Sequence, residues 1–491
     1  MKIFGKRIKR ELLWTIVGVL ITAIGVLIAL FAWILPRQAR LREEDRKYIK
    51  ETVRTEVERG IQDYLDGLPQ TKNPDLKRLF ERGYSLYKDE KYPEAIDTFK
   101  ACLELKTKDS ERRALLTLLG NAYYKLGELE QAEDRYQEAL LIGKRIDDQE
   151  GKAIALGNIG LIYFSKRDLD KALKYYQDAL NIDKEIGNSE GEAGDLGNIG
   201  LIYQLKGDLD QALKYHQASL EISEKIGYRQ NKAIQLGNIG LIFGAKGDLD
   251  KALKCHQDAL KIDKKIGCRE GEAKQLVGIG LIYQAKGDLE KALKFFGNAL
   301  KIDKEMGLKE NEVTCLDNIG YAYWLNGDLD KALKCYEDAR QLNKQIGREK
   351  SEASQLHTIS LIYLQKFDLD KALKYSEDAL EINKKIGFKE GEASDLSTIG
   401  IFYKMKGNLD QALKYLEDAL KIHREIGLRE DEAQDLSSIG AIHENKGDLD
   451  KGLKYYNEAL EIFEKIGTRE WIEQTKRNIE RISQQMKNKK K

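Results

Sequence analysis

The 491-residue sequence has almost no net charge and few residues of the kinds that form disulfides or bind metals. Its 83 lysines and arginines nearly balance its 82 aspartates and glutamates, so the charge gives no reason to expect nucleic acid as a partner. Its five cysteines are odd in number and follow no disulfide or zinc spacing. We expect most of Cys102, Cys255, Cys268, Cys315 and Cys335 to be small buried residues.

Catalytic motifs are also missing. The histidines are His216, His256, His357, His423 and His443, and they lie at scattered positions that form no ligand cluster. The glycines of Gly157-Asn158-Ile159-Gly160 resemble a phosphate loop, but they lie within a predicted helix and no Gly-Lys-Ser/Thr follows them. The sequence therefore predicts no enzyme, no cofactor and no metal site.

What the sequence does contain is a forty-residue repeat. A leucine returns at one equivalent position from the first third of the chain almost to its end: Leu116, Leu156, Leu196, Leu236, Leu276, Leu316, Leu356, Leu396 and Leu436. Self-similarity with a period of this size indicates a stacked array in which each repeat contacts its neighbours. Function is then expected on an extended surface.

The sequence of each repeat predicts two amphipathic helices. In one repeat, apolar residues recur at helical spacing through 153–163 and again through 169–186. Pairs such as Gly207-Asp208 separate the two helices, because glycine suits a left-handed residue and aspartate caps the next helix. Glycine inside a helix costs about 1 kcal/mol relative to alanine, so the recurring Gly160 and its equivalents require a packing reason.

This pattern resembles the tetratricopeptide repeat (TPR) family, over roughly residues 75–470. The family's order of large residue, Leu-Gly-like pair, tyrosine, alanine, aromatic and alanine falls on Leu156, Ile159-Gly160, Tyr163, Ala172, Tyr176 and Ala179. The forty-residue unit is most similar to the arrays of the LGN/Pins and kinesin light chain type. The resemblance implies an all-α solenoid, a right-handed superhelix of helical hairpins. Local departures occur at Ser360, Gly452, His216, His256, Ser376 and Leu416.

The resemblance also implies a binding groove along the first helix of each hairpin. Residues just before and after the helix glycine line this groove in similar families, and here they include an asparagine series and a leucine series. The expected groove residues are Asn158, Asn198, Asn238, Asn318, Leu161, Leu201, Leu241, Leu281, Tyr321 and Trp324. Asparagine both donates and accepts hydrogen bonds, which suits a peptide backbone, and leucine suits apolar side chains.

The alternative is that both series serve only packing or capping. Positions where the repeats differ are therefore more informative. One inner position holds Gln204, Gly244, Gln284, Trp324, Leu364, Lys404 and Glu444, and another holds Gly157, Gly197, Gly237, Val277, Asp317, His357, Ser397 and Ser437. Tyr321 and Trp324 make the middle repeats the most distinctive anchoring surface.

The N-terminal region differs from the array. Residues 12–35 carry no charge, and twenty-four residues suffice for a helix to cross a hydrocarbon layer about 30 Å thick, so we expect a transmembrane helix and membrane-lipid contact. A cleaved signal peptide is the alternative, but the apolar run is long and lacks a clean cleavage site. Positive residues flank both ends in similar numbers and leave the side of the membrane open.

The predicted organisation has five parts: a basic segment 1–11, a transmembrane helix 12–35, a helical stalk 36–74, about ten repeats over 75–468, and a capping helix with a basic tail over 469–491. A thin apolar stripe on the stalk suits either self-association as a coiled coil or contact with the first repeat. The last segment suits a terminal cap, because its apolar residues cover a face that has no following repeat.

Together these observations predict a single-pass membrane protein that acts as a scaffold. Its groove is expected to bind a peptide or helical segment of a partner protein, for complex assembly or signalling. The alternative is a regulatory or sensory subunit that acts with a separate enzyme or nucleic-acid-binding protein. A chaperone-type carboxylate clamp is not expected, because Phe80, Leu118 and Ile154 stand at its positions on the first three inner helices.

Overall fold

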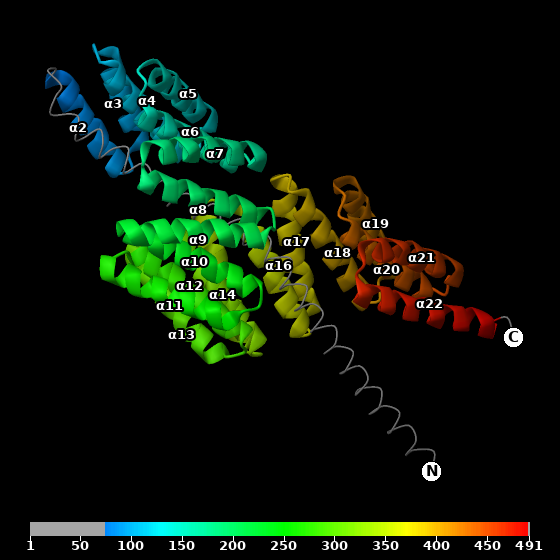
Figure 1. Ribbon diagram of the computed structural model, residues 1–491. Coiled ribbons are helices and arrows are strands. Elements are labelled where there is room, and N and C mark those ends of the chain that lie inside the picture. The colour runs from blue at the N-terminus through cyan, green and yellow to red at the C-terminus, as the bar shows by residue number, and fades with distance from the viewer. Residues whose placement is uncertain (1–73, 490–491) are drawn as a thin grey trace. The chain divides into compact units, whose positions relative to one another are not determined.

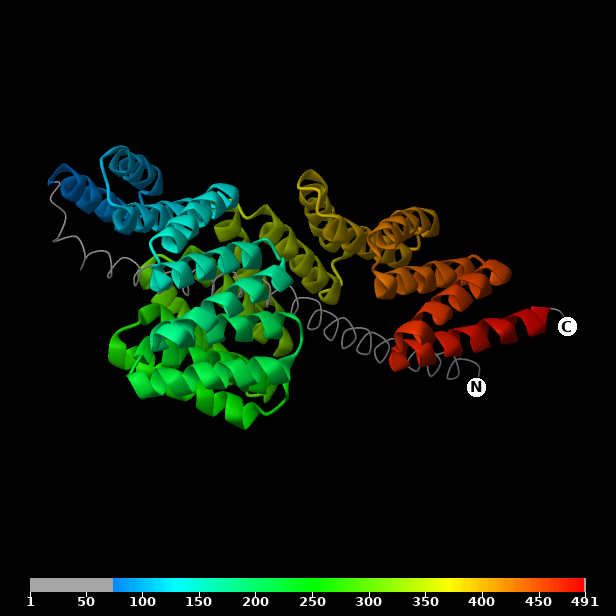
Figure 2. The ribbon, with the colours of Figure 1, turned by 45° about the horizontal axis from the view of Figure 1, so that its top comes forward.

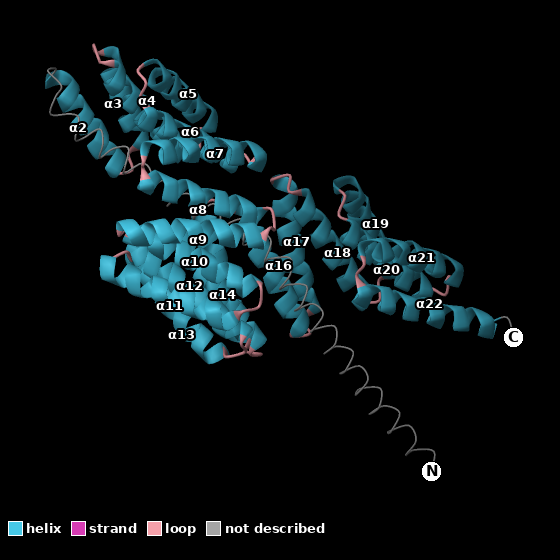
Figure 3. Ribbon diagram, in the orientation of Figure 1, coloured by secondary structure: helices cyan, strands magenta, loops and turns pink. Residues whose placement is uncertain are grey.

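The computed structural model describes residues 74–489, and every regular element in this range is an α-helix (Figure 3). The helices are α2 (Pro74–Lys88), α3 (Tyr92–Glu104), α4 (Asp109–Leu126), α5 (Leu129–Arg145), α6 (Gln149–Ser165), α7 (Leu169–Ile186), α8 (Ser189–Leu205), α9 (Leu209–Ile226), α10 (Arg229–Ala245), α11 (Leu249–Ile266) and α12 (Arg269–Ala285). They continue with α13 (Leu289–Met306), α14 (Lys309–Leu325), α15 (Leu329–Gln345), α16 (Glu349–Gln365), α17 (Leu369–Lys385), α18 (Lys389–Met405), α19 (Leu409–Ile426), α20 (Arg429–Asn445), α21 (Leu449–Ile466) and α22 (Arg469–Lys489).

The helices end and begin at the glycine and aspartate positions predicted from the sequence. Gly207 adopts a left-handed φ of 82° after α8, and the side chain of Asp208 then accepts a hydrogen bond from the backbone N–H of Gln211 at 3.0 Å. The same aspartate cap, with asparagine at Asn408, opens later second helices. Phe367 occupies the glycine position in one repeat, and it keeps the left-handed φ, at 61°, with its side chain 71% exposed.

Helix glycines make room for an aromatic ring of the neighbouring helix. A Cβ placed on Gly160 would lie 3.2 Å from the Tyr176 ring, and one on Gly280 would lie 2.5 Å from Phe296. The packing reason expected for these glycines is thus confirmed, and its main cause is the ring of the second helix.

On either side of α12, successive helices pack side by side, both within each hairpin and from one hairpin to the next, as α19 to α22 show in orange and red in two views (Figure 1, Figure 2). The fold divides into two compact units after Gly278, inside α12. Unit one contains the described helices before this point, and unit two contains those after it. Each unit has its own buried apolar clusters.

An ion-pair ladder joins adjacent repeats on the solvent side. In several repeats the lysine that follows the first helix reaches an aspartate on the second helix of the preceding repeat. The described pairs are Lys206–Asp170, Lys246–Asp210, Lys366–Asp330, Lys406–Asp370 and Lys446–Asp410. Each pair is exposed and contributes little to stability alone. The pairs nevertheless recur at the same place between adjacent repeats.

The last helix covers the end of unit two. Ile482 of α22 is fully buried, and it packs with Leu449 and Tyr456 of α21. A Cβ on Gly452 would lie 2.8 Å from Ile482 Cδ1, which explains why glycine replaces the alanine of other repeats there.

The expected membrane-spanning helix requires a correction. Of the helices between residues 74 and 489, none combines the length and the apolar character that crossing a bilayer requires. This finding overturns the fold assignment that included a transmembrane helix, together with the single-pass membrane location. The segments 1–11, 12–35 and 36–73 lie outside the described residues, so self-association through the stalk stays a prediction.

Candidate binding surface on the first helices

The first helices of the hairpins lie closer together than the second helices do. In unit one α4 contacts α6, α6 contacts α8 and α8 contacts α10, and in unit two α16 contacts α18 and α18 contacts α20. Within the described part, the second helices of neighbouring hairpins make no comparably close approach. The first helices therefore form the inner side of each unit, which is where a groove is expected.

The predicted asparagines are buried on this side. Asn158, Asn198 and Asn238 belong to unit one, where 3 to 5% of each residue is exposed, and Asn318 of unit two is 2% exposed. The Nδ2 atom of Asn238 has no hydrogen-bond partner in the structure. A ligand could contact only the small exposed part of each asparagine. The role of these residues in binding stays a prediction.

The predicted apolar residues differ in exposure. Leu161 and Leu201 are buried, whereas Leu241 and Leu281 are half-buried. Leu281 lies in unit two with Asn318, Tyr321 and Trp324, so the ten predicted residues fall on two units and do not form one described site.

Tyr321 and Trp324 lie together on α14. Their ring centroids are 6.2 Å apart in an edge-on arrangement, with Tyr321 buried and Trp324 half-buried. Trp324 Nε1 donates a hydrogen bond to Gln365 Oε1 of the next first helix. The indole thus links neighbouring repeats while part of its surface remains accessible.

A buried polar network between repeats was not predicted from the sequence. At the α9–α10 junction, Gln235 Nε2 donates to Asn231 Oδ1, and Asn231 Nδ2 donates to Ser223 Oγ. Because Gln235 Oε1 is then free to accept, His216 Nδ1 donates to it over 2.7 Å. Burial lowers the pKa of His216 to about 4, so this histidine is neutral at neutral pH.

Related contacts recur in unit two with different residues. Each links a first helix, the next first helix and the second helix between them. The three sets are Asp317–Gln355–Asn343, His357–Asp395–Asn383 and Ser397–Asp435–His423. The variable inner position three residues before the helix glycine therefore serves the junction between repeats in these cases.

The sequence contains a combination of residues that indicates this network. Where the variable position is Gly197 or Gly237, the next repeat supplies a glutamine and the second helix supplies a histidine. A Cβ on Gly197 would lie 2.7 Å from Gln235 Nε2, so glycine leaves the space through which the glutamine reaches His216.

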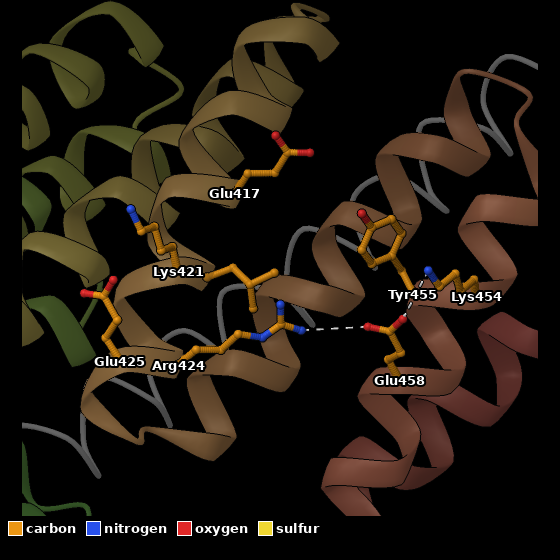
Figure 4. A pocket seen from close by; sticks show the side chains of 8 residues that line it. Glu417, Lys421, Arg424, Glu425, Lys454, Tyr455 and Glu458 are labelled. Atoms are coloured by element: carbon orange, nitrogen blue, oxygen red, sulfur yellow. Dashed lines mark ion pairs between the residues drawn. The ribbon is translucent and has the colours of Figure 1, made fainter.

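A pocket of roughly 590 Å³ lies on the outer side of unit two, between α19 and α21 (Figure 4). Six of its eight lining residues are charged, with Glu417, Glu425 and Glu458 balancing Lys421, Arg424 and Lys454. Arg424 lies 3.8 Å from Glu458, and also bonds Glu432 at 2.9 Å. Equal numbers of opposite charges on an open surface do not define a ligand, and no cluster of three metal-ligating side chains occurs between residues 74 and 489.

Repeated helical hairpins of constant length, packed in order and closed by a terminal helix, define the class of α-solenoid repeat proteins. Family models described as tetratricopeptide repeat match residues 110–185, 196–265, 273–345, 351–425 and 436–466. The chain belongs to the tetratricopeptide repeat family. The comparison with curated proteins gave no match.

Solved structures with a similar fold include a protein with a repeat sensor and a quorum sensor. One is the STAND protein PH0952 from Pyrococcus horikoshii, which has a tetratricopeptide repeat sensor. It is 21% identical with a TM-score of 0.55, and the match covers 74% of this chain and 56% of that one. The other is the apo quorum sensor NprR from B. thuringiensis, which is 18% identical with a TM-score of 0.50 over 72% of this chain and 97% of that one. At these identities the similarity concerns the fold alone.

Proposed function

We propose that this protein is a scaffold or adaptor that binds a peptide or helical segment of partner proteins on its first helices, for complex assembly or signalling. The observation that carries this proposal is the contrast between the two sides of the repeats. The outer ladder repeats the same lysine–aspartate pair, whereas one inner position changes from Gln204 and Gly244 to Trp324, Leu364 and Lys404. A surface whose chemistry changes from repeat to repeat suits recognition of a specific segment.

No catalytic role forms part of the proposal. In the outer pocket Glu458 pairs with Arg424 and Lys454, and the buried histidines His216 and His256 each bond a glutamine. Neither arrangement presents a nucleophile with an adjacent base to a substrate. We therefore expect the protein to act through its partners.

A sensory or regulatory subunit is the second candidate. PH0952 and NprR, which share the fold, are described as a protein with a repeat sensor and as a quorum sensor. In this version of the proposal, a bound segment alters the contact with a separate enzyme or nucleic-acid-binding protein. The two versions differ in whether occupancy of the inner surface changes a partner's activity.

The test is capture of partners by the purified full-length chain, followed by affinity measurement with each purified partner. One variant carries Asn198→Ala, Asn238→Ala and Asn318→Ala, and a second carries Trp324→Ala. The control is Asn298→Ala, because Asn298 is exposed on a second helix.

The expected result is at least a tenfold loss of affinity in the inner-surface variants, with unchanged helicity and no loss in the control. A partner that binds all variants equally would place recognition elsewhere and overturn the groove assignment.

A further inference from the structure

An unpaired lysine lies on the inner side of unit two. Lys404 is half-buried on α18, and the structure gives it no hydrogen bond or ion pair with any residue in the described range. The equivalent position in other repeats holds Gln204, Gly244, Trp324 or Leu364, none of which is cationic. This ammonium group is therefore a specific feature of one repeat.

The carboxylate whose charge acts on Lys404 is already engaged by other residues. Glu444, at the equivalent position of α20, accepts hydrogen bonds from Arg481 Nε at 2.9 Å and Arg481 Nη2 at 2.8 Å. It also accepts hydrogen bonds from Tyr456 Oη and Gln485 Nε2, each at 3.0 Å. Glu444 therefore attracts Lys404 through its charge but makes its hydrogen bonds and its ion pair with other residues, so the ammonium group of Lys404 has no direct carboxylate contact in the described range.

The surroundings of Lys404 reduce its contact with water. Burial lowers its pKa, and Arg481 lowers it further, while the charge of Glu444 opposes these effects only in part. A desolvated ammonium without a partner is unfavourable, so an arriving carboxylate gains more there than at an exposed lysine.

Exposed apolar residues flank this group. Ile401 is 40% exposed and Met405 is 53% exposed, and both lie on α18 within a turn of Lys404. Leu361 and Leu364 are half-buried on α16, which contacts α18. Leu161 and Leu201, equivalent to Ile401 in unit one, are 3 and 6% exposed, so the inner side is more accessible here.

We propose that α16 and α18 bind an apolar segment of a partner protein that carries an aspartate or glutamate, whose carboxylate pairs with Lys404. Leu361, Leu364, Ile401 and Met405 contact the apolar side chains of that segment. This inference rests on the proposed function and adds to it the location and the charge of the recognised segment. The ion pair selects an acidic residue at one position, and the apolar contacts supply most of the buried area.

A phage-displayed library of random twelve-residue peptides, selected on the full-length chain, tests the inference. Parallel selections use Lys404→Glu and the control Lys414→Glu, which makes the same charge change on the exposed side of α19. Affinities of the selected peptides are then measured with amidated C-termini, so that a terminal carboxylate does not substitute for a side chain. Lys404→Arg serves as the conservative variant.

The expected result is enrichment of peptides with one acidic residue among apolar ones. Such peptides bind Lys404→Glu at least tenfold more weakly, retain affinity for Lys404→Arg and Lys414→Glu, and lose affinity when their acidic residue becomes lysine. Lys404→Glu should partly recover binding of those lysine peptides.

Peptides that bind inner-surface residues without an acidic preference would overturn the role of Lys404 and leave the proposed function standing. A selection that yields no binder, or binders unaffected by every inner-surface variant, would count against both. Dependence on the free C-terminus would replace the side-chain carboxylate by a terminal one and overturn the proposal as stated.

Discussion

His423 Nδ1 lies 2.8 Å from Asp435 Oδ2, where the second helix of one repeat meets the first helix of the next. Asp435 Oδ1 also accepts a hydrogen bond from Ser397 Oγ at 2.6 Å. One buried carboxylate thus joins α18, α19 and α20, and each of these three residues belongs to a different helix. Repeats in unit two are held by specific polar contacts as well as by apolar packing.

Asp435→Ala is expected to weaken this junction. The change leaves His423 and Ser397 without their acceptor, and an unsatisfied buried polar group costs about 2 kcal/mol. Hydrogen exchange should show lower protection in α19 and α20, with α13 to α15 little affected because repeats couple mainly to their neighbours. Asp418→Ala, at an exposed position of α19, is the control. Equal protection in both variants would show that the junction does not depend on this carboxylate.

Because His216 is buried in its neutral form, the protein should lose stability in acid. Its pKa falls from 6.5 to about 4 on folding because of burial, so the unfolded chain binds the extra proton as the pH drops. Stability that is present above pH 6.5 is therefore lost towards pH 4, and the loss from this group between pH 7 and pH 5 is about 2 kcal/mol.

The comparison of wild type with His216→Tyr measures this contribution by denaturation at pH 7 and pH 5. Tyrosine occupies the equivalent place at Tyr176, and the variant should lose less stability on acidification. Asp263, whose pKa burial raises to about 6, contributes stability in acid that is lost as the pH rises, and it is the same in both proteins. Identical pH profiles would contradict a neutral buried His216.

Two glycine substitutions should have opposite effects. Gly452→Ala places a methyl group against Ile482 Cδ1 at 2.8 Å and the Gly440 carbonyl oxygen at 3.1 Å, and should loosen α22 at a cost of about 1 to 2 kcal/mol. Gly297→Ala meets no atom within 4 Å and should stabilise α13 by up to about 1 kcal/mol.

Thermal denaturation of both variants checks the difference. Adding Ile482→Val to Gly452→Ala removes the Cδ1 atom and should recover part of the loss, which separates this contact from the backbone contact. A stabilising effect of Gly452→Ala would show that α22 adjusts without strain.

The repeat, the helix pairs and the caps followed from the sequence because they depend on local features. The spacing of apolar residues along a helix, the aspartate before a second helix and the glycine after it each act over about one helical turn. Phe367 shows how strongly the array enforces this geometry, because a bulky side chain keeps the left-handed conformation that glycine adopts elsewhere. Adjacent helices on both sides fix the turn.

The candidate site was less predictable because its exposure depends on how repeats pack. The same leucine position is buried at Leu161 and, as isoleucine, 40% exposed at Ile401. Periodicity alone gives these two residues the same environment. The pairing of Gln235 with His216 joins residues nineteen positions apart and depends on the missing side chain of Gly197, so spacing within a helix did not reveal it.

The lysine–aspartate ladder has a consequence for how such a chain diversifies. Lys206–Asp170 and Lys446–Asp410 join different repeats through the same two positions, and neither position takes part in the variable inner series. A duplicated forty-residue segment carries both the lysine and the aspartate of the ladder. A copied repeat can therefore form these ion pairs with its neighbours without further change. Inner residues that make no contact across the junction can then acquire a new specificity while attachment to the array is preserved.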